Sequence, residues 1–273
     1  SSSPTGPELD GEQSSVGQRA GPGSSERLWF DPEALEPRYS VIGSDIWSDE
    51  AGFDDAVANS GITGICGSGI IEALGEMYLS GIITAEGVID GSLASRTDRI
   101  IEDGRTFKYQ ITDTVSILQN DVRAIQLAKA ALHAGFRLLM DKMLLERVDR
   151  VILAGAFGSY IDPKYAMVLG MVPDCPLDKV IAAGNSAGAG ARMALLNIDQ
   201  RQMIEATVRQ IEKIETAVEA DFQNHFVRAM AFPHKTDPYP CLSAAVVLPP
   251  RDLSDNVASA DNPGRRRGGR RKG

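Results

Sequence analysis

Two glycine turns that each follow a short apolar run constrain the fold most strongly. Residues 147–158 read RVDRVILAGAFG, and residues 179–190 read KVIAAGNSAGAG. Each segment passes from charged residues to a few apolar ones and then to small residues, which is typical of a buried strand that enters a tight turn. The second turn also opens a helix of small residues. Because a helical segment separates the two units, the pattern predicts an α/β architecture.

A third glycine turn, CGSG at residues 66–69, stands directly before a helical pattern. The apolar residues that follow it predict a helix that is buried on one side and ends at Gly81. Residues 120–140 give the clearest amphipathic helix. The apolar positions after CGSG are Ile70, Ile71, Leu74, Met77 and Tyr78.

The two ends of the folded region carry weaker patterns. Residues 27–42 predict two short strands joined by a proline-bounded loop. Residues 200–230 are charged and predict a helix with one apolar face, and residues 237–248 predict a last strand. The apolar face comprises Ile204, Val208, Ile211, Ile214 and Val218.

The charge of the chain is acidic overall but basic at its end. Twenty-eight Lys and Arg against 37 Asp and Glu give a net charge of -9, which argues against a body that wraps nucleic acid or lies on anionic lipid. Residues 263–273, PGRRRGGRRKG, carry six positive charges and no acid, so residues 1–262 hold -15. We expect a connector at 1–26, a folded lobe at 27–248 and a disordered basic tail at 249–273.

Three cysteines, Cys66, Cys175 and Cys241, are odd in number and have no C-x-x-C spacing. This pattern favours neither a disulfide framework nor a zinc site, and it fits a reducing cytoplasm. We interpret all three as small buried residues. No run approaches the roughly 20 apolar residues that span a bilayer, and no signal peptide is visible. The sequence therefore predicts a cytoplasmic protein without a membrane segment.

The three histidines, His133, His225 and His234, lack the i, i+4 spacing of a helical metal site. We therefore expect packing or surface roles for them and no metal. Asp121 is interpreted as a charge in the first turn of its helix. Glu72 lies one turn into the helix after CGSG. An acidic residue there is favoured by the helix dipole, and the alternative is that Glu72 orients a water or a metal-bound phosphate.

The three glycine turns share one chemical property. Removing side chains lets backbone amides approach a ligand, and a following helix directs its positive end to the same place, so an anionic group could bind there. Glycine also serves tight turns and close helix packing. The segments match neither the G-x-x-x-x-G-K-[ST] phosphate loop nor an intact G-x-G-x-x-G with its downstream acid.

Four segments together resemble a known family. TGICGSGIIEAL, QNDVRAIQLAKAAL, VILAGAFGSYIDPKYAMVLGMVPD and GNSAGAGARMALLN are similar to the carboxyl-terminal ATPase region of the reductive activators of corrinoid proteins. Those activators belong to the acetate and sugar kinase, heat-shock ATPase and actin superfamily. The likeness runs from about residue 1 to residue 240, in order and at matching spacing. It implies the second lobe of an actin-like ATPase, with a mixed sheet flanked by helices.

The resemblance also implies a chemistry: ATP-dependent return of Co(II) corrinoid proteins to Co(I), the state that accepts a methyl group in methyltransferase systems. In full-length relatives an iron-sulfur domain delivers the electron. The implied cofactors are ATP and Mg²⁺, with the iron-sulfur cluster confined to full-length relatives. The implied partners are a corrinoid protein and an upstream ATPase and iron-sulfur segment; a homodimer stays open, whereas a membrane or nucleic acid is not expected.

The sequence departs from the family pattern at its start. The two D-x-G-T phosphate loops of the family lie upstream of the SSPTGP segment, where this sequence begins, and the iron-sulfur cysteines are missing. Whether the chain itself is an enzyme is left open for this reason. The main hypothesis is the ATP-binding part of an activator, and the alternative is a non-catalytic fragment that binds a corrinoid protein. A third hypothesis is RNA contact through the arginine-rich tail.

Carried over by position, the resemblance implies three groups of nucleotide-binding residues. One group lines the adenosine side of the cleft, one forms a turn that faces the nucleotide at a helix start, and one closes the neighbouring loop. Gln126 and Lys129 are additional candidates for the adenine or ribose, with a solvated surface lysine as the alternative. The three groups are, in turn, Gly155, Ala156, Phe157 and Gly158; Gly67, Ser68 and Gly69; and Asn185 with Gly188.

Overall fold

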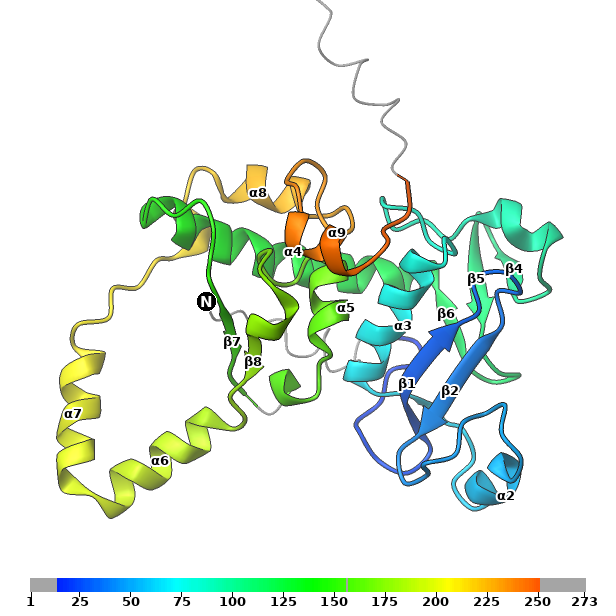
Figure 1. Cartoon of the computed structure of the whole chain (residues 1–273), viewed down its shortest axis with the longest axis horizontal. Coiled ribbons are helices and arrows are strands. Elements are labelled where there is room, and N and C mark those ends of the chain that lie inside the picture. Colours follow the sequence, from blue (N-terminus) through cyan, green and yellow to red (C-terminus); the bar gives the residue numbers. More distant parts are fainter. Residues whose placement is uncertain (1–13, 156, 251–273) are drawn as a thin grey trace, which may run out of the picture.

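The computed structural model describes residues 14–155 and 157–250. The predicted tail at 249–273 therefore lies almost wholly outside the described residues, as does Ala156. The described strands form three small sheets, with the strand orders β2-β1-β3, β4-β5-β6 and β7-β8, and helices pack around them (Figure 1). The expected α/β class is confirmed.

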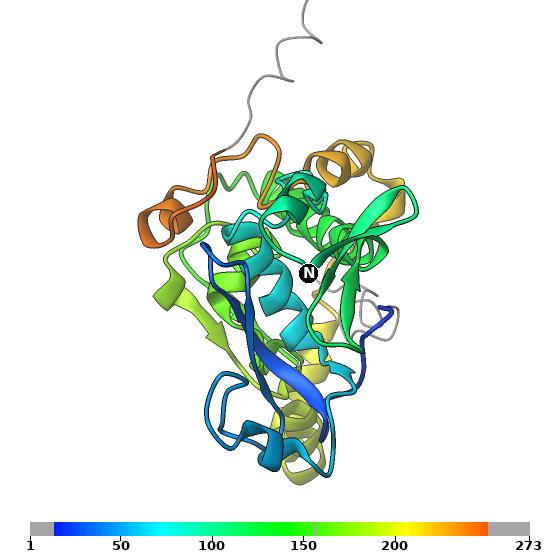
Figure 2. The same cartoon turned by 90° about the vertical axis from the view of Figure 1, so that its right-hand side faces the viewer.

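The predicted hairpin and the helix after CGSG are both present. Strand β1 (Ser24–Phe30) pairs antiparallel with β2 (Pro37–Val41) and parallel with the short β3 (Gly64–Ile65). Helix α3 (Gly67–Leu79) follows β3, and Figure 2 shows the hairpin laid along it. The apolar face of α3 packs into the main core, and the short helix α2 (Phe53–Val57) covers a second, smaller apolar cluster beside β2.

A second antiparallel sheet leads into the longest described helix. Strands β4 (Ile100–Asp103), β5 (Thr106–Gln110) and β6 (Ser116–Leu118) follow the 3-10 turn η1 (Gly91–Ser95). Helix α4 (Gln119–Lys142) begins directly after β6, as the pattern over 120–140 predicts.

The two strand-and-turn units form the third sheet. Strands β7 (Val151–Leu153) and β8 (Val180–Ala182) pair in parallel, and the segment between them contains η2 (Phe157–Ser159), α5 (Pro163–Val168) and η3 (Leu177–Lys179). The prediction that these strands are buried is confirmed for one face, where Val180 is 7% exposed, and wrong for the other. Ile152 and Ile181 are 54% and 47% exposed, because the described part of the chain places no further strand or helix over that side of the sheet.

Helices α6 (Ser186–Leu196) and α7 (Ile198–Val208) form an arm that projects from the body at the lower left of Figure 1. Neither helix has a buried residue. The single helix predicted over 200–230 is wrong: α7 ends at Val208, and the chain continues through η4 (Thr216–Val218) to α8 (Phe222–Arg228). With the predicted apolar face left uncovered, no packing holds one long helix together.

The last strand predicted within residues 237–248 is also wrong. Helix α9 (Pro240–Ala245) occupies this segment, with Pro240 in its first turn. Proline fits that position because its missing N–H has no intrahelical partner there. Among the described helices, none is long and apolar enough to cross a membrane.

Candidate functional site

The two glycine turns after β7 and β8 lie side by side. The amide of Gly155 donates to the carbonyl of Gly184 at 2.9 Å, and the amide of Ala183 donates to the carbonyl of Leu153 at 2.8 Å. Gly155 and Gly184 have φ values of 122° and 66°, and a Cβ on either would meet no atom within 4 Å. Their backbones therefore face open space at the carboxyl ends of parallel strands, where open α/β sheets bind ligands.

The second turn is completed by a helix cap. The Asn185 side chain accepts a hydrogen bond from the amide of Gly188 at 2.9 Å and so caps the start of α6. Both residues are exposed. The positive end of the α6 dipole consequently lies next to the paired turns, where it favours an anionic group.

Gly158 allows close packing of η2 against β7. A Cβ on Gly158 would lie 3.1 Å from the Cβ of Leu153, so this glycine lets η2 fold back on β7. The Ser159 hydroxyl donates to the carbonyl of Gly155 at 3.1 Å. The structure thus brings Gly155, Gly158, Asn185 and Gly188 into one region; Phe157 belongs to η2.

The CGSG turn is used differently. Gly67 and Gly69 are buried and Ser68 is half-buried. A Cβ on Gly69 would lie 2.6 Å from the carbonyl oxygen of Ser25, so glycine permits close packing of α3 on β1. Within the described residues, no hydrogen bond joins this turn to the other two. Buried Cys66, with its sulfur 3.2 Å from the Ser68 hydroxyl, has the expected packing environment.

Two buried carboxylates hold α3 in place. Glu72 accepts from the Arg27 guanidinium at 3.0 and 3.1 Å and from the amide of Leu28 at 3.2 Å. Burial raises the pKa of Glu72, and Arg27 opposes that rise. The hypothesis that Glu72 orients a water or a bound phosphate is therefore not supported, because its oxygens are directed to β1.

Glu76, one turn further along the same face of α3, attaches the helix to α5. It accepts from Lys164 at 2.9 Å and from the Tyr165 hydroxyl at 2.7 Å. Burial raises the pKa of Tyr165, and the hydrogen bond to Glu76 raises it further. Because α5 follows the first glycine turn, this network orients that turn relative to α3. The sequence pattern carried no signal for it.

Gln126 and Lys129 are held by the protein's own backbone. The interpretation of Lys129 as a solvated surface residue is wrong, and a contact of either side chain with adenine or ribose is not supported. Lys129 has no exposed surface, and its ammonium donates to the carbonyls of Ala231 and Pro233. Gln126 donates to the carbonyls of Glu86 and Met230. The two side chains therefore attach α4 to the backbone that follows α8. An alternation of apolar residues and single polar ones could not reveal these distant partners.

Asp121 has the structural role at the start of its helix that its position predicts, and it also binds a residue far away in the sequence. Its carboxylate accepts from the amide of Leu118 at 2.8 Å, at the start of α4, and also from the amide and hydroxyl of Ser15 at 2.8 and 2.7 Å. Cys175 is buried as expected, whereas Cys241 is only half-buried, so the prediction for Cys241 is wrong.

Two histidines meet although they are far apart in sequence. His133 and His234 are buried and stacked, with ring centroids 4.6 Å apart and planes at 14°. Together with Asp237 they offer three metal-ligand atoms that lie within 4.8 Å of one another. The i, i+4 spacing considered in the sequence does not reveal this cluster, because its residues come from segments far apart in the chain.

The geometry of the histidine cluster does not suit a metal ion. The Nδ1 atom of His234 already accepts from the amides of Thr236 and Asp237, at 3.3 and 2.8 Å. Stacked rings also direct their in-plane lone pairs in parallel rather than toward one point. Of the packing or surface roles predicted for the three histidines, packing fits His133 and His234, which are both buried. The Nε2 atom of His225 instead lies 3.0 Å from the carboxylate of Asp141.

Comparison with known proteins identifies the fold family. The family model of the C-terminal domain of RACo, the ASKHA domain, matches residues 1–243. The corrinoid activation enzyme RamQ of Eubacterium limosum is 28% identical over 242 residues, covering 83% of this chain and 38% of that protein. The solved structure of a reductive activator for corrinoid, iron-sulfur protein matches with a TM-score of 0.70 and 30% identity, covering 84% of this chain and 35% of its own.

This chain thus spans little more than a third of the length of these two relatives. The matches confirm both the family resemblance and the actin-like fold that the sequence predicts. Because the family model covers most of the chain, this protein belongs to the family of the C-terminal ASKHA domain of RACo.

Proposed function

We propose that this chain is the ATP-binding part of a reductive activator that returns Co(II) corrinoid proteins to Co(I) for methyl transfer. The observation that carries the proposal is the pair of hydrogen-bonded glycine turns at the carboxyl ends of β7 and β8. Both relatives are named as activators of corrinoid proteins. In this proposal the transferred electron comes from an iron-sulfur segment outside this chain.

The paired turns suit one wall of a nucleotide site. Gly155 and Gly184 present backbone without side chains to open space, so a flat purine or a ribose can approach closely. The capped start of α6 favours the negative charge of the nucleotide's phosphates. A Mg²⁺ ion bound with the nucleotide would neutralise part of that phosphate charge. Hydrolysis also needs groups that position water and metal around the phosphates, and these belong to the opposite wall.

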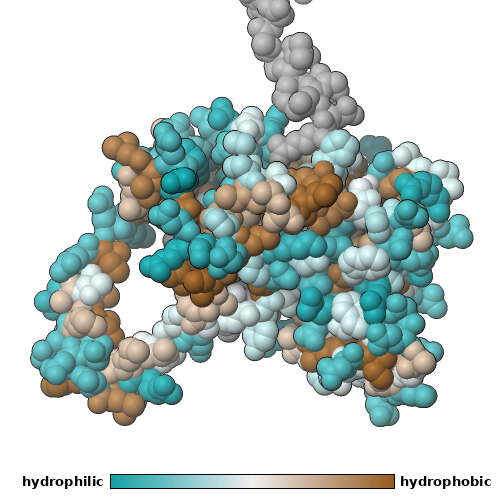
Figure 3. All heavy atoms as spheres, viewed as in Figure 1, coloured by the Kyte–Doolittle hydropathy of each residue, from teal (hydrophilic) through white to brown (hydrophobic). Residues whose placement is uncertain are grey.

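The exposed apolar surface supports an opposite wall built by another segment. A two-stranded parallel sheet is marginal by itself, and parallel sheets are normally covered on both faces. Here β7 and β8 expose Ile152 and Ile181, and the neighbouring arm exposes further large apolar side chains (Figure 3). We infer that β7, β8 and the arm pack against the part of the activator that this chain does not span. The arm's exposed apolar residues include Met193, Leu195, Leu196, Ile198, Met203 and Val208.

Binding of Mg²⁺ and ATP tests the nucleotide site. We expect weak binding by this chain and ordinary affinity once the remaining part of the activator is joined to it, measured by isothermal titration calorimetry. Gly184→Val should abolish binding because its side chain enters the open space beside the turn. Gly104→Val is the matched control, since Gly104 has a similar φ of 65° and equally open surroundings in the β4–β5 turn.

The alternative is a chain that binds a corrinoid protein without catalysis. A pull-down of the corrinoid protein in the absence of any ATP hydrolysis would favour it. If the joined, longer protein neither binds ATP nor supports corrinoid reduction, the main proposal is abandoned.

A further inference from the structure

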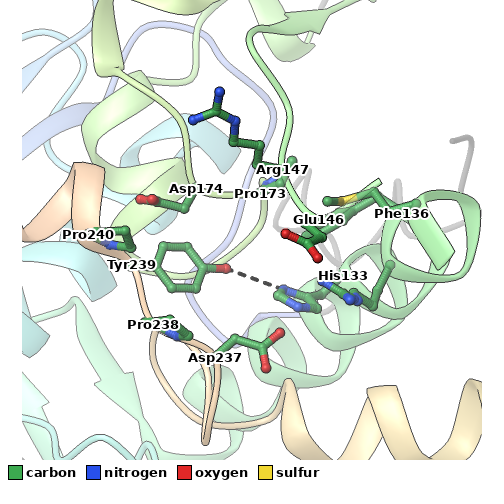
Figure 4. Close-up of a pocket in the computed structure, with 12 residues that line it drawn as sticks. His133, Phe136, Glu146, Arg147, Pro173, Asp174, Asp237, Pro238, Tyr239 and Pro240 are labelled. Carbon is green, nitrogen blue, oxygen red and sulfur yellow. Dashed lines mark hydrogen bonds between the residues drawn. The ribbon is translucent and has the colours of Figure 1, made fainter. Parts of the chain in front are cut away.

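A cavity of about 320 Å³ lies on the side of α4 that carries His133 (Figure 4). Its walls come from the second half of α4, the loop after it, and the segments around Asp174 and Tyr239. The paired glycine turns contribute nothing to its lining. The cavity is therefore separate from the proposed nucleotide site.

One side of the cavity presents mainly hydrogen-bond acceptors. Figure 4 shows the carboxylates of Glu146 and Asp237 on either side of the His133 ring, with the ring of Tyr239 facing them. Glu146 has no ion-pair or hydrogen-bond partner among the described residues. Carboxylates only accept when ionised, so this arrangement calls for a ligand rich in donors.

His133 adds a buried acceptor to the same wall. The residue is 3% exposed, and its Nδ1 atom lies 3.0 Å from the carbonyl oxygen of Gly170. A carbonyl only accepts, so Nδ1 carries the proton and Nε2 offers a lone pair. Burial lowers the pKa of His133 to about 3, which keeps the ring neutral. Among the described residues, Nε2 has no hydrogen-bond partner.

The two arginines of the lining leave this wall free. Arg137 is held by Asp141 at 2.9 Å, one helical turn away. The guanidinium of Arg147 points away from His133 in Figure 4. The aromatic rings of Phe136 and Tyr239, with three prolines, complete the cavity. Carboxylates combined with aromatic faces form the surroundings that a guanidinium prefers, because it donates in its plane and stacks on its face.

We propose that an arginine of this chain's own segment 265–271 occupies this cavity. The segment holds five of the six cationic residues near the carboxyl end, whereas residues 1–262 carry -15. The described chain passes close to the cavity shortly before it ends: Leu248 lines a neighbouring hollow together with three residues that also line the cavity itself, Pro238, Tyr239 and Pro240. Pro249 and Pro250 then lie against the segment after α3, in a hollow that they share with Tyr78. From Pro250 to Arg265, about 15 residues reach up to about 50 Å.

Attachment to the same chain strengthens such a contact. A segment tethered by a linker of this length meets its site at an effective concentration of about a millimolar. A weak charge-assisted pair with Glu146 and Asp237 then suffices for occupancy, and salt opposes it. Docking in the cavity also competes with contacts between the arginines and other anions, including RNA.

Limited trypsin digestion of the full chain tests the proposal. Trypsin cuts after arginine, so an arginine in the cavity is protected. We expect the tail of a Glu146→Gln, Asp237→Asn variant to be cut about tenfold faster than that of the unaltered chain at low salt. A matched control, Glu212→Gln with Asp199→Asn, removes the same two charges from exposed positions in α7 and in the segment after it, and should leave the rate unchanged.

Three outcomes overturn the proposal. Equal cutting of the unaltered chain and the cavity variant excludes the tail as occupant, including the case in which a different cation binds there. If the control variant increases the rate of tail cutting as much as the cavity variant does, the rate depends on the net charge of the chain and not on the cavity. If the double variant loses its unfolding transition, the single variant Glu146→Gln replaces it, because this change affects only one exposed carboxylate. A tail-cutting rate of Glu146→Gln equal to that of the unaltered chain then excludes binding of the tail in the cavity.

Discussion

At the scale of single residues, buried polar side chains in this protein have specific distant partners. Lys129 attaches α4 to the carbonyls of Ala231 and Pro233, and Glu72 and Glu76 attach α3 to its neighbours. Burial of such groups is tolerated because each is hydrogen-bonded. The sequence shows that these residues are polar and lie within helices, but a partner about 100 positions away is decided by tertiary packing.

Replacing Lys129 with methionine should destabilise the chain. The apolar side chain fits a buried position, but it leaves two carbonyls without their donor, so we expect a loss of about 3 kcal/mol in the free energy of unfolding. Urea denaturation followed by circular dichroism measures this loss. Lys213→Met, at a site with 79% side-chain exposure, should change the free energy by less than about 0.5 kcal/mol. Equal effects of the two changes would contradict the buried role.

His133 should make the fold sensitive to acid. Burial lowers its pKa to about 3 in the folded chain, against about 6.5 when unfolded. Between these values the unfolded state binds a proton that the folded state does not. Its contribution to stability is therefore present above about pH 6.5 and is lost as the pH falls toward 3, by up to about 1.4 kcal/mol per pH unit.

Urea denaturation at about pH 5 and about pH 7.5 checks this dependence. His133→Gln removes the titrating group, so the variant should lose less stability than the unaltered chain between the two conditions. The same loss in both proteins would show that other groups cause the acid sensitivity.

At the scale of elements, the α6–α7 arm differs from every other described helical segment of comparable length. α3 and α4 bury an apolar stripe, whereas the arm exposes its large apolar residues to solvent. Most helical stability in proteins comes from packing of such a face. Its exposure is consistent with the packing against another segment inferred above.

Substitutions in the α6–α7 arm should weaken binding to the remaining part of the activator with little effect on the stability of this chain. Leu195, Leu196 and Ile198 are 75%, 76% and 67% exposed, so changing all three to glutamine should alter the free energy of unfolding of this chain by less than about 0.5 kcal/mol per site. Binding of the remaining part of the activator, measured by sedimentation velocity, should weaken at least about tenfold. Val247→Gln, at an apolar residue with 92% exposure outside the arm, serves as the control and should bind normally.

At the scale of the whole molecule, the chain combines a well-packed half with an open one. The core around β1, α3 and α4 is continuous with α5, while β7, β8 and the arm leave apolar surface exposed. The main predictable features lie in the packed half, where periodicity reflects burial. The predicted strand burial and the long helix over 200–230 fail in or beside the open half, where apolar residues have no described neighbour to cover them. The predicted last strand fails for a different reason, because Pro240 begins a short helix whose Leu242 is buried in the core.

The sequence by itself determined the α/β class, the hairpin, α3, α4 and the family, because local periodicity, glycine turns and motif spacing are properties of neighbouring residues. It also showed where small residues follow β7 and β8. Only the tertiary structure decided that Gly155 and Gly184 meet, that CGSG packs on β1, that Lys129 is buried and that His133 faces a cavity. Each of these depends on contacts between segments distant in the chain, and local pattern carries no information about which distant segment will supply a partner.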